Sequence, residues 1–134
     1  MKIHALGEAA LRVNDLPVMR RFYEDVFGFE PLGAFDDAVL YGIAPGYGGH
    51  TQVFGLFARG VPVSPQGTTL DHIAFTIDRE DFESERTRLL ALGLNVELAD
   101  HPWVHWRSLY VRDPEGNEIE LVCYDPTVRG DALP

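Results

Sequence analysis

The chain has 134 residues, 46% of them hydrophobic, and 21 acidic against 11 basic side chains give a net charge of −10. This length and apolar content suit one compact domain with a buried core, while the acidity argues against nucleic acid and anionic membranes as partners. The single cysteine, Cys123, excludes an internal disulfide and a multi-cysteine metal site. No apolar run approaches the ~20 residues of a membrane span, and no signal-peptide core is present, so we expect a cytoplasmic protein.

The first half of the chain predicts one strand, one helix and three further strands. We expect a strand over residues 3–13, after which Asn14 and Asp15 offer a helix cap. An amphipathic helix follows, and Gly28 ends it in the left-handed conformation. Strands are expected over residues 31–35, 38–43 and 52–57, with a glycine-rich loop at 45–49. This loop lacks the lysine and the following helix of a phosphate-binding loop.

The second half predicts the same order of elements. Residues 59–68 read as a linker, followed by a strand over residues 70–77, a helix over about 79–92 and strands over 95–98, 105–111 and 118–124. Pro114, in a strong turn signal, separates the last two strands. The repeat predicts an α+β fold in which two βαβββ units, about 3–58 and 69–124, build a single domain over residues 1–134 with a curved mixed sheet around a metal cleft.

Three polar residues stand out within the predicted strands. Glu8 and His72 lie 64 positions apart. Each is the first residue on the same face of the alternating stretch in its copy of the repeat. Glu120 lies in the apolar final strand, where a carboxylate is costly unless it is paired or binds a cation. Alone, each has an ordinary explanation, as a solvent-facing glutamate or a structural histidine. Together they form a plausible three-ligand site for a divalent metal, with Glu118 beside the turn and outside the site.

Four segments carry a family resemblance: residues 12–16, 21–29, 70–75 and 113–121. They resemble the vicinal-oxygen-chelate superfamily, which includes glyoxalase I, extradiol dioxygenases, fosfomycin-resistance enzymes, methylmalonyl-CoA epimerase and bleomycin-resistance proteins. The resemblance spans about residues 5–124 and implies His72 and Glu120 as metal ligands. Glu8 stands where many members have histidine, so the resemblance favours one Zn, Ni, Mn or Mg ion over Fe. The glutamate that glyoxalases supply from the last strand of the first unit is absent from residues 52–57, unless His50, Gln52 or Glu8 substitutes.

A further group of residues is expected to contact a substrate. The resemblance places Ser108 and Tyr110 where fosfomycin-resistance enzymes have substrate-contacting hydroxyl groups, although both also suit ordinary strand positions. Two tryptophans could wall a pocket, or they could pack in the core or a dimer contact. The expected catalytic residues are His105 and Tyr110, and the expected substrate contacts are His50, Trp103, Trp106, Arg107 and Ser108.

The leading functional hypothesis is a divalent-metal-dependent enzyme of the glyoxalase-like type that performs isomerase, epimerase or lyase chemistry on a small oxygenated substrate. One alternative is a metal-free binding protein of the bleomycin-resistance type, which the acidic charge and the two tryptophans also suit. An extradiol-type dioxygenase and a non-catalytic partner domain remain open. We also expect a homodimer, because a curved sheet leaves apolar edges for a symmetric partner to cover.

Overall fold

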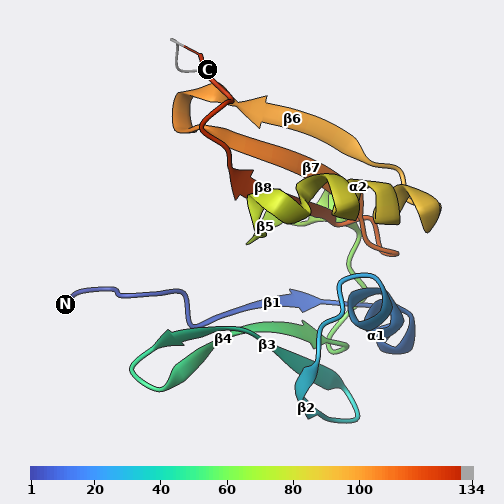
Figure 1. The fold of residues 1–134 in the computed structure, drawn as a ribbon. Helices are drawn as coiled ribbons and strands as arrows, with labels where there is room; N and C mark the ends of the chain where they lie inside the picture. The colour runs from blue at the N-terminus through green and yellow to red at the C-terminus, as the bar shows by residue number, and fades with distance from the viewer. Residues whose placement is uncertain (131–134) are drawn as a thin grey trace. The chain divides into compact units, whose positions relative to one another are not determined.

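In the computed structural model, which describes residues 1–130, the chain consists of two compact units, Met1–Gly67 and Thr68–Pro134. Each unit contains one strand, one helix and three further strands in that order (Figure 1). Each sheet is mixed: its first strand runs parallel to the last strand of the same unit, and the remaining pairs are antiparallel. The α+β fold of two βαβββ units expected from the sequence is therefore confirmed.

The first unit follows the expected order of elements. They are β1 (Glu8–Arg12), α1 (Leu16–Asp25), β2 (Pro31–Ala34), β3 (Ala38–Tyr47) and β4 (His50–Phe57), and the sheet order is β1-β4-β3-β2. Helix α1 starts where expected, because the Asp15 carboxylate accepts a hydrogen bond from the Val18 amide at 3.1 Å. The buried Tyr23 ring lies 5.0 Å from that of Phe54, so α1 packs on the β4 face that carries Phe54.

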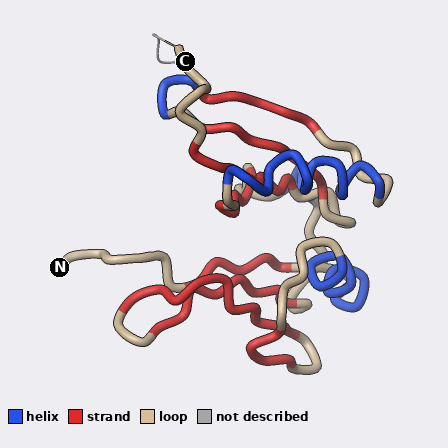
Figure 2. The backbone as a smooth tube through the Cα atoms, viewed as in Figure 1, coloured by secondary structure: helices blue, strands red, loops and turns tan. Residues whose placement is uncertain are grey.

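Strands β1 and β3 differ most from the expectation. Residues before Glu8 form a loop (Figure 2), since the ladder between β1 and β4 begins at the Glu8–Val53 pair. The expected glycine-rich loop instead belongs largely to β3, which reaches Tyr47 and pairs it with His50. Register shifts on this hairpin and positive φ angles at its glycines allow the longer ladder.

The second unit repeats the design. Its elements are β5 (His72–Thr76), a 3₁₀ turn (Arg79–Asp81), α2 (Phe82–Ala91), β6 (Glu97–His101), β7 (Trp106–Arg112) and β8 (Glu118–Tyr124), and the sheet order is β5-β8-β7-β6. Strand β8 has the expected bounds, whereas β6 begins later and extends to His101. The face of this sheet that α2 covers is apolar and buried. The core residues of this unit are Phe82 and Leu89 from α2, and Leu109, Val111, Ile119, Leu121 and Cys123 from the sheet.

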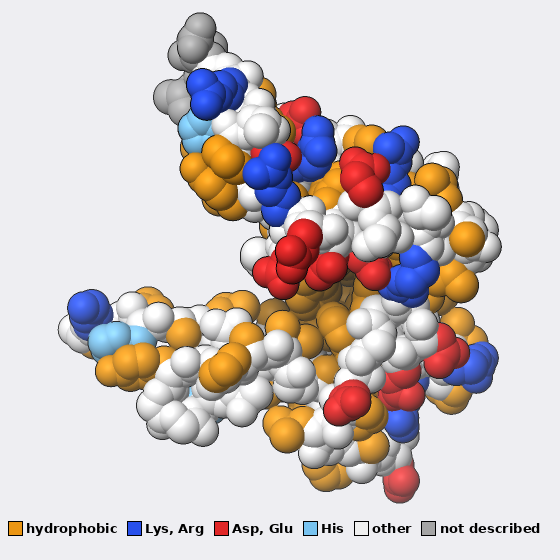
Figure 3. Space-filling model, viewed as in Figure 1, with side chains coloured by type: hydrophobic (Ala, Val, Ile, Leu, Met, Phe, Trp, Pro, Cys, Tyr) orange, Lys and Arg blue, Asp and Glu red, His pale blue; other side chains and the backbone are white. Residues whose placement is uncertain are grey.

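The surface of the second unit carries charges of both signs. Acidic and basic side chains lie side by side on the face seen in Figure 3. On α2, Arg88 pairs with Glu85 at 2.6 Å and Arg86 approaches Glu83 at 3.6 Å, which are the i, i+3 spacings of a solvated helix surface. Among residues 1–130, no helix is long and apolar enough to cross a membrane.

Candidate functional site

The polar residues of the second unit gather on the sheet face opposite α2. Side chains alternate along a strand, and residues paired across two strands share a face. Strand β8 pairs Glu118 with His72 and Glu120 with Ala74, and β7 pairs Tyr110 with Glu120. Because Glu118 and Glu120 are two residues apart on β8, this register places both of them on one face of the sheet together with His72 and Tyr110.

Glu120 is the centre of this group and is only 5% exposed. Its Oε1 atom accepts hydrogen bonds from the Ser108 hydroxyl and, at 3.1 Å, from the Tyr110 hydroxyl. Its Oε2 atom lies 3.2 Å from His72 Nε2. The buried carboxylate is therefore satisfied by two hydroxyl donors on one oxygen and faces an imidazole with the other, which offsets the cost of burying its charge.

The Asp71 carboxylate orients the His72 ring through its other nitrogen, Nδ1. Its Nδ1 atom lies 2.6 Å from Asp71 Oδ1, and this hydrogen bond is the main cause that raises the pKa of His72, against desolvation. The negative charges of Glu120, Asp71 and Glu118 raise the pKa further. A carboxylate only accepts, so Nδ1 carries the proton and a neutral His72 presents a lone pair at Nε2. This is the orientation that a carboxylate gives to metal-binding histidines.

The contact between His72 and Glu120 fits a cation site. In the neutral ring, Nε2 and Glu120 Oε2 are two acceptors only 3.2 Å apart, so they repel each other unless a positive charge lies with them. A proton on Nε2 is one such charge, and a divalent ion is another. Ligand atoms with metal bonds of about 2.0–2.2 Å lie roughly 3.0–3.5 Å apart in octahedral or tetrahedral shells. The observed separation falls in this range.

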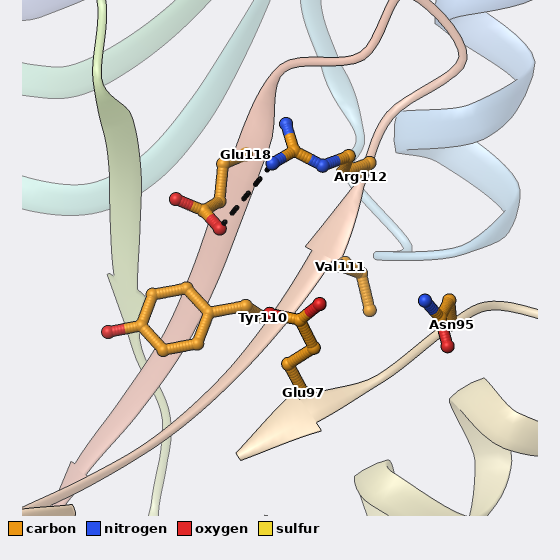
Figure 4. Close-up of a pocket in the computed structure, with 6 residues that line it drawn as sticks. All are labelled: Asn95, Glu97, Tyr110, Val111, Arg112 and Glu118. Carbon is orange, nitrogen blue, oxygen red and sulfur yellow. Dashed lines mark ion pairs between the residues drawn. The ribbon is translucent and has the colours of Figure 1, made fainter. Parts of the chain in front are cut away.

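Glu118 lies at the edge of the same group. Together with Asp71 and His72 it forms a group of possible metal ligands within residues 1–130. Each of the three side chains offers one ligand atom, and these atoms lie within 4.8 Å of one another. Glu118 and Tyr110 extend to the same side from neighbouring strands, and Arg112 reaches Glu118 at 3.9 Å (Figure 4). These residues border a cavity of about 110 Å³, enough for a few waters or one small substituent.

A second histidine, not singled out as a site residue from the sequence, joins the group. His101 Nε2 lies 3.2 Å from the Tyr110 hydroxyl and 3.7 Å from Glu120 Oε1. The pKa of Tyr110 is raised, first by burial and then by the charge of Glu120. Alternation along β6 could have revealed His101, because Glu97 pairs with Tyr110 and His101 lies four residues further on the same face.

Two expected site residues do not join this group. Arg107 lies on the opposite face of β7, with its guanidinium 5.4 Å from the Phe82 ring of α2 and within 3.8 Å of Asp125. His105 has a left-handed backbone with φ of 58° at the turn before β7, and its Nδ1 atom lies 2.7 Å from the Val128 carbonyl oxygen. Both side chains therefore contribute to packing between the β7 end of the unit and the chain after β8.

The two tryptophans are half-exposed neighbours. Their ring centroids lie 6.4 Å apart, and the exposed fractions are 46% for Trp103 and 45% for Trp106. Trp106 pairs with Tyr124 on the face that carries Ser108 and Tyr110. Trp106 therefore shares a face with the Glu120 group, at the opposite end of β7 from Arg112.

The remaining expected residues belong to the first unit. Glu8 is exposed on β1, and its Oε1 atom lies 3.3 Å from the point where a Cβ on Gly55 would be. Gly55 takes the same place in the β1–β4 ladder that Glu120 takes in the β5–β8 ladder. His50 is exposed at the start of β4, with its ring 3.6 Å from the Cβ position of Gly7.

Comparison with known proteins finds similar chains over almost the whole length. The metallothiol transferase FosB of Staphylococcus epidermidis is 27% identical over 127 residues, which covers 90% of this chain and 82% of the relative. The FosB of Lysinibacillus sphaericus is 24% identical over 127 residues, with 90% and 83% covered. Among solved structures, a lactoylglutathione lyase from Agrobacterium tumefaciens has a TM-score of 0.69 at 27% identity, covering 91% of this chain and 95% of the other.

A more distant structure shares the fold alone. The fosfomycin resistance protein FosX from Listeria monocytogenes has a TM-score of 0.70 at 21% identity, and 96% of this chain and all of the other are covered. A family model, Glyoxalase/Bleomycin resistance protein/Dioxygenase superfamily, matches residues 5–121, most of the chain. The resemblance seen in the sequence is thereby confirmed. The chain belongs to the glyoxalase/bleomycin resistance protein/dioxygenase superfamily.

Proposed function

We propose that the chain is a divalent-metal-dependent enzyme acting on a small oxygenated substrate, with Glu8, His72 and Glu120 as metal ligands. The observation that carries the proposal is the 3.2 Å contact between His72 Nε2 and Glu120 Oε2, two atoms that repel each other unless a positive charge, either a proton or a divalent ion, lies with them. The Asp71 hydrogen bond turns the lone pair of His72 toward that contact. Zn, Ni, Mn and Mg suit a set of one imidazole and two carboxylates better than Fe does.

The side chains around Glu120 have distinct roles in this proposal. A bound divalent ion polarises substrate oxygens and stabilises negative charge that develops on them. Tyr110 keeps its proton at neutral pH, since tyrosine ionises near pH 10 and its pKa is raised further here, and its hydroxyl donates that proton to Glu120 Oε1 and holds the carboxylate in place. Ser108, fully buried, holds Glu120 Oε1. Isomerisation, epimerisation and lyase chemistry all use such stabilisation of developing negative charge, and the names of the FosB relatives add group transfer of a thiol to these classes.

Metal analysis of protein purified without chelator is the decisive experiment. We expect about one bound divalent ion per chain, and calorimetric titration of the metal-free protein should give the affinity. Glu8→Gln and His72→Gln should each weaken binding by more than the ~10–100-fold that loss of an outer-shell partner causes. If Glu8→Gln binds as tightly as the unmodified chain, Glu8 is not a ligand. If no metal binds at all, the proposal fails.

A metal-free binding protein is the second candidate. The exposed Trp103 and Trp106 pair and the net charge of −10 favour an aromatic, cationic ligand held by stacking and charge. Quenching of tryptophan fluorescence by such a ligand, in the presence of chelator, would support this candidate. The homodimer remains a separate prediction, and a monomer in sedimentation at micromolar concentration would contradict it.

A further inference from the structure

We propose that the two histidines beside Glu120 have opposite tautomers and opposite functions: His72 is the metal ligand, and His101 is a hydrogen-bond donor that positions Tyr110 and Glu120. His101 is then a positioning residue outside the ligand set. The ligand half of this inference rests on the proposed function, whereas the tautomers are properties of the metal-free chain.

The argument starts from the single proton of the Tyr110 hydroxyl. Glu120 is an acceptor when ionised, and the Tyr110 oxygen lies 3.1 Å from Glu120 Oε1, so the hydroxyl donates to the carboxylate. Having one proton, the hydroxyl has none left for a second acceptor. It can only accept from any further partner.

His101 is that further partner. Its Nε2 atom lies 3.2 Å from the Tyr110 oxygen, within hydrogen-bond distance, whereas Glu120 Oε1 is 3.7 Å away. Nε2 must therefore carry the hydrogen and donate it to Tyr110. The result is a directed chain from His101 through Tyr110 to Glu120, and it leaves Nε2 of His101 without a lone pair for a metal.

His72 has the opposite arrangement around the other oxygen of the same carboxylate. Asp71 accepts from its Nδ1–H at 2.6 Å, so the neutral ring has its lone pair on Nε2, which faces Glu120 Oε2 at 3.2 Å. Oε1 of Glu120 is thus occupied by hydroxyl donors, and Oε2 faces a ligand-type nitrogen. By fixing the Tyr110 proton on Oε1, His101 helps to keep Oε2 turned toward His72.

Nitrogen-15 NMR of the metal-free protein tests the tautomers directly. At alkaline pH, where both rings are neutral, long-range proton–nitrogen spectra should show His72 as the Nδ1–H form and His101 as the Nε2–H form. Loss of the corresponding signals in His72→Gln and His101→Gln assigns them. In Tyr110→Phe, which removes the acceptor, His101 should change to a mixture of forms while His72 does not. An Nδ1–H form of His101, or no response to Tyr110→Phe, overturns the inference.

Metal titration tests the division of function. Because glutamine retains an N–H donor, His101→Gln should bind Zn²⁺ within about tenfold of the unmodified chain, less than an average outer-shell loss. His101→Leu, which has no donor, should bind more weakly than His101→Gln, and His72→Gln should bind most weakly. Equal, severe losses in His101→Gln and His72→Gln would make His101 a ligand and overturn the inference. If the unmodified chain binds no Zn²⁺, the proposed function fails, and the NMR result alone decides the tautomers.

Discussion

The two units share one backbone plan but differ in what they place on the sheet face opposite the helix. In the ladders of the parallel pairs, Glu8 corresponds to His72 and Gly55 corresponds to Glu120. In the antiparallel pairs, Leu40 of β3 faces Gly55 as Tyr110 of β7 faces Glu120. The first unit therefore has a glycine and a leucine where the second has a carboxylate and a phenol. The polar group of the second unit therefore arises from different side chains at equivalent positions of the sheet, while the backbone plan stays the same.

Gly55 shows why the first unit does not reproduce that group. A Cβ at this position would lie 2.8 Å from the Phe57 ring, 3.0 Å from a Leu40 methyl and 3.3 Å from Glu8 Oε1. The neighbouring side chains thus occupy the space that a side chain at position 55 would need. Glu8 keeps open surroundings on its own sheet, whereas His72 has carboxylates on both sides.

The largest effect should come from removing the carboxylate that distinguishes the second unit. Glu120→Gln retains the shape and an acceptor for Ser108, so the fold should persist while metal affinity falls by more than about 100-fold. Glu118→Gln, two residues earlier on the same face, should change affinity by less than about tenfold. Calorimetric titration gives both values. Equal losses in the two variants would place Glu118 among the ligands, as its proximity to Asp71 and His72 permits.

The next effect concerns the hydroxyl that holds Glu120. Ser108→Ala makes β7 resemble β3, where Ala38 has the corresponding place. The change removes a buried donor to a charged group and should lower the free energy of unfolding by about 1.5–3 kcal/mol. Denaturant unfolding measures it. Ser84→Ala is the control, because its exposed hydroxyl bonds only a backbone carbonyl and should cost less than about 0.5 kcal/mol. Similar losses in both variants would show that Ser108 does not stabilise Glu120.

A smaller effect should follow from adding a side chain at position 55 of the first unit. Gly55→Ala must displace the ends of the Phe57 and Leu40 side chains, so we expect a loss of roughly 1–2 kcal/mol in unfolding free energy. Gly67→Ala provides the control, since nothing lies within 4 Å of its added Cβ. Thermal unfolding distinguishes the two. A Gly55→Ala protein as stable as the Gly67→Ala protein would mean that the space beside Glu8 is open.

The smallest effect is the pH dependence of the metal-free protein. His72 has a pKa raised from 6.5, chiefly by Asp71, so its protonation stabilises the folded chain. This contribution is complete below pH 6.5, the unfolded value, and is lost as the pH rises through the raised folded pKa. The effect is small because the side chain is 39% exposed. His72→Gln should flatten the fall in unfolding free energy over this range, as denaturant unfolding at a series of pH values would show.

Local patterns were sufficient to predict most of the fold. The β8 strand has its expected bounds, and the Asp15 cap and the Gly28 stop place α1. The errors arise where pairing with a distant strand decides the outcome. Residues 3–7 have strand-like composition, but β4 pairs with β1 only from Val53 onward. Tyr47 enters β3 because it meets His50 across a bulged hairpin, which the local glycines alone did not indicate.

The candidate site was predictable wherever strand alternation applies. The spacing of Ser108 and Tyr110 on β7 places both beside Glu120, whereas Arg107, one residue out of step, turns toward α2. His101 was missed because the expected strand ended at residue 98, before the alternation of β6 reaches it. His105 has a left-handed backbone at a turn, a conformation that composition does not indicate for histidine.

The buried Cys123 has a practical consequence for measuring this protein. It is 1% exposed on β8, and burial raises the pKa of its thiol, so the reactive thiolate is scarce at neutral pH. As the sole cysteine, it leaves the unmodified chain nearly inert to thiol-directed dyes. Single cysteines introduced at exposed positions, one in each unit, can therefore carry a donor and an acceptor fluorophore without prior removal of the native thiol. The distance between the units in solution, with and without metal, then becomes directly measurable by energy transfer.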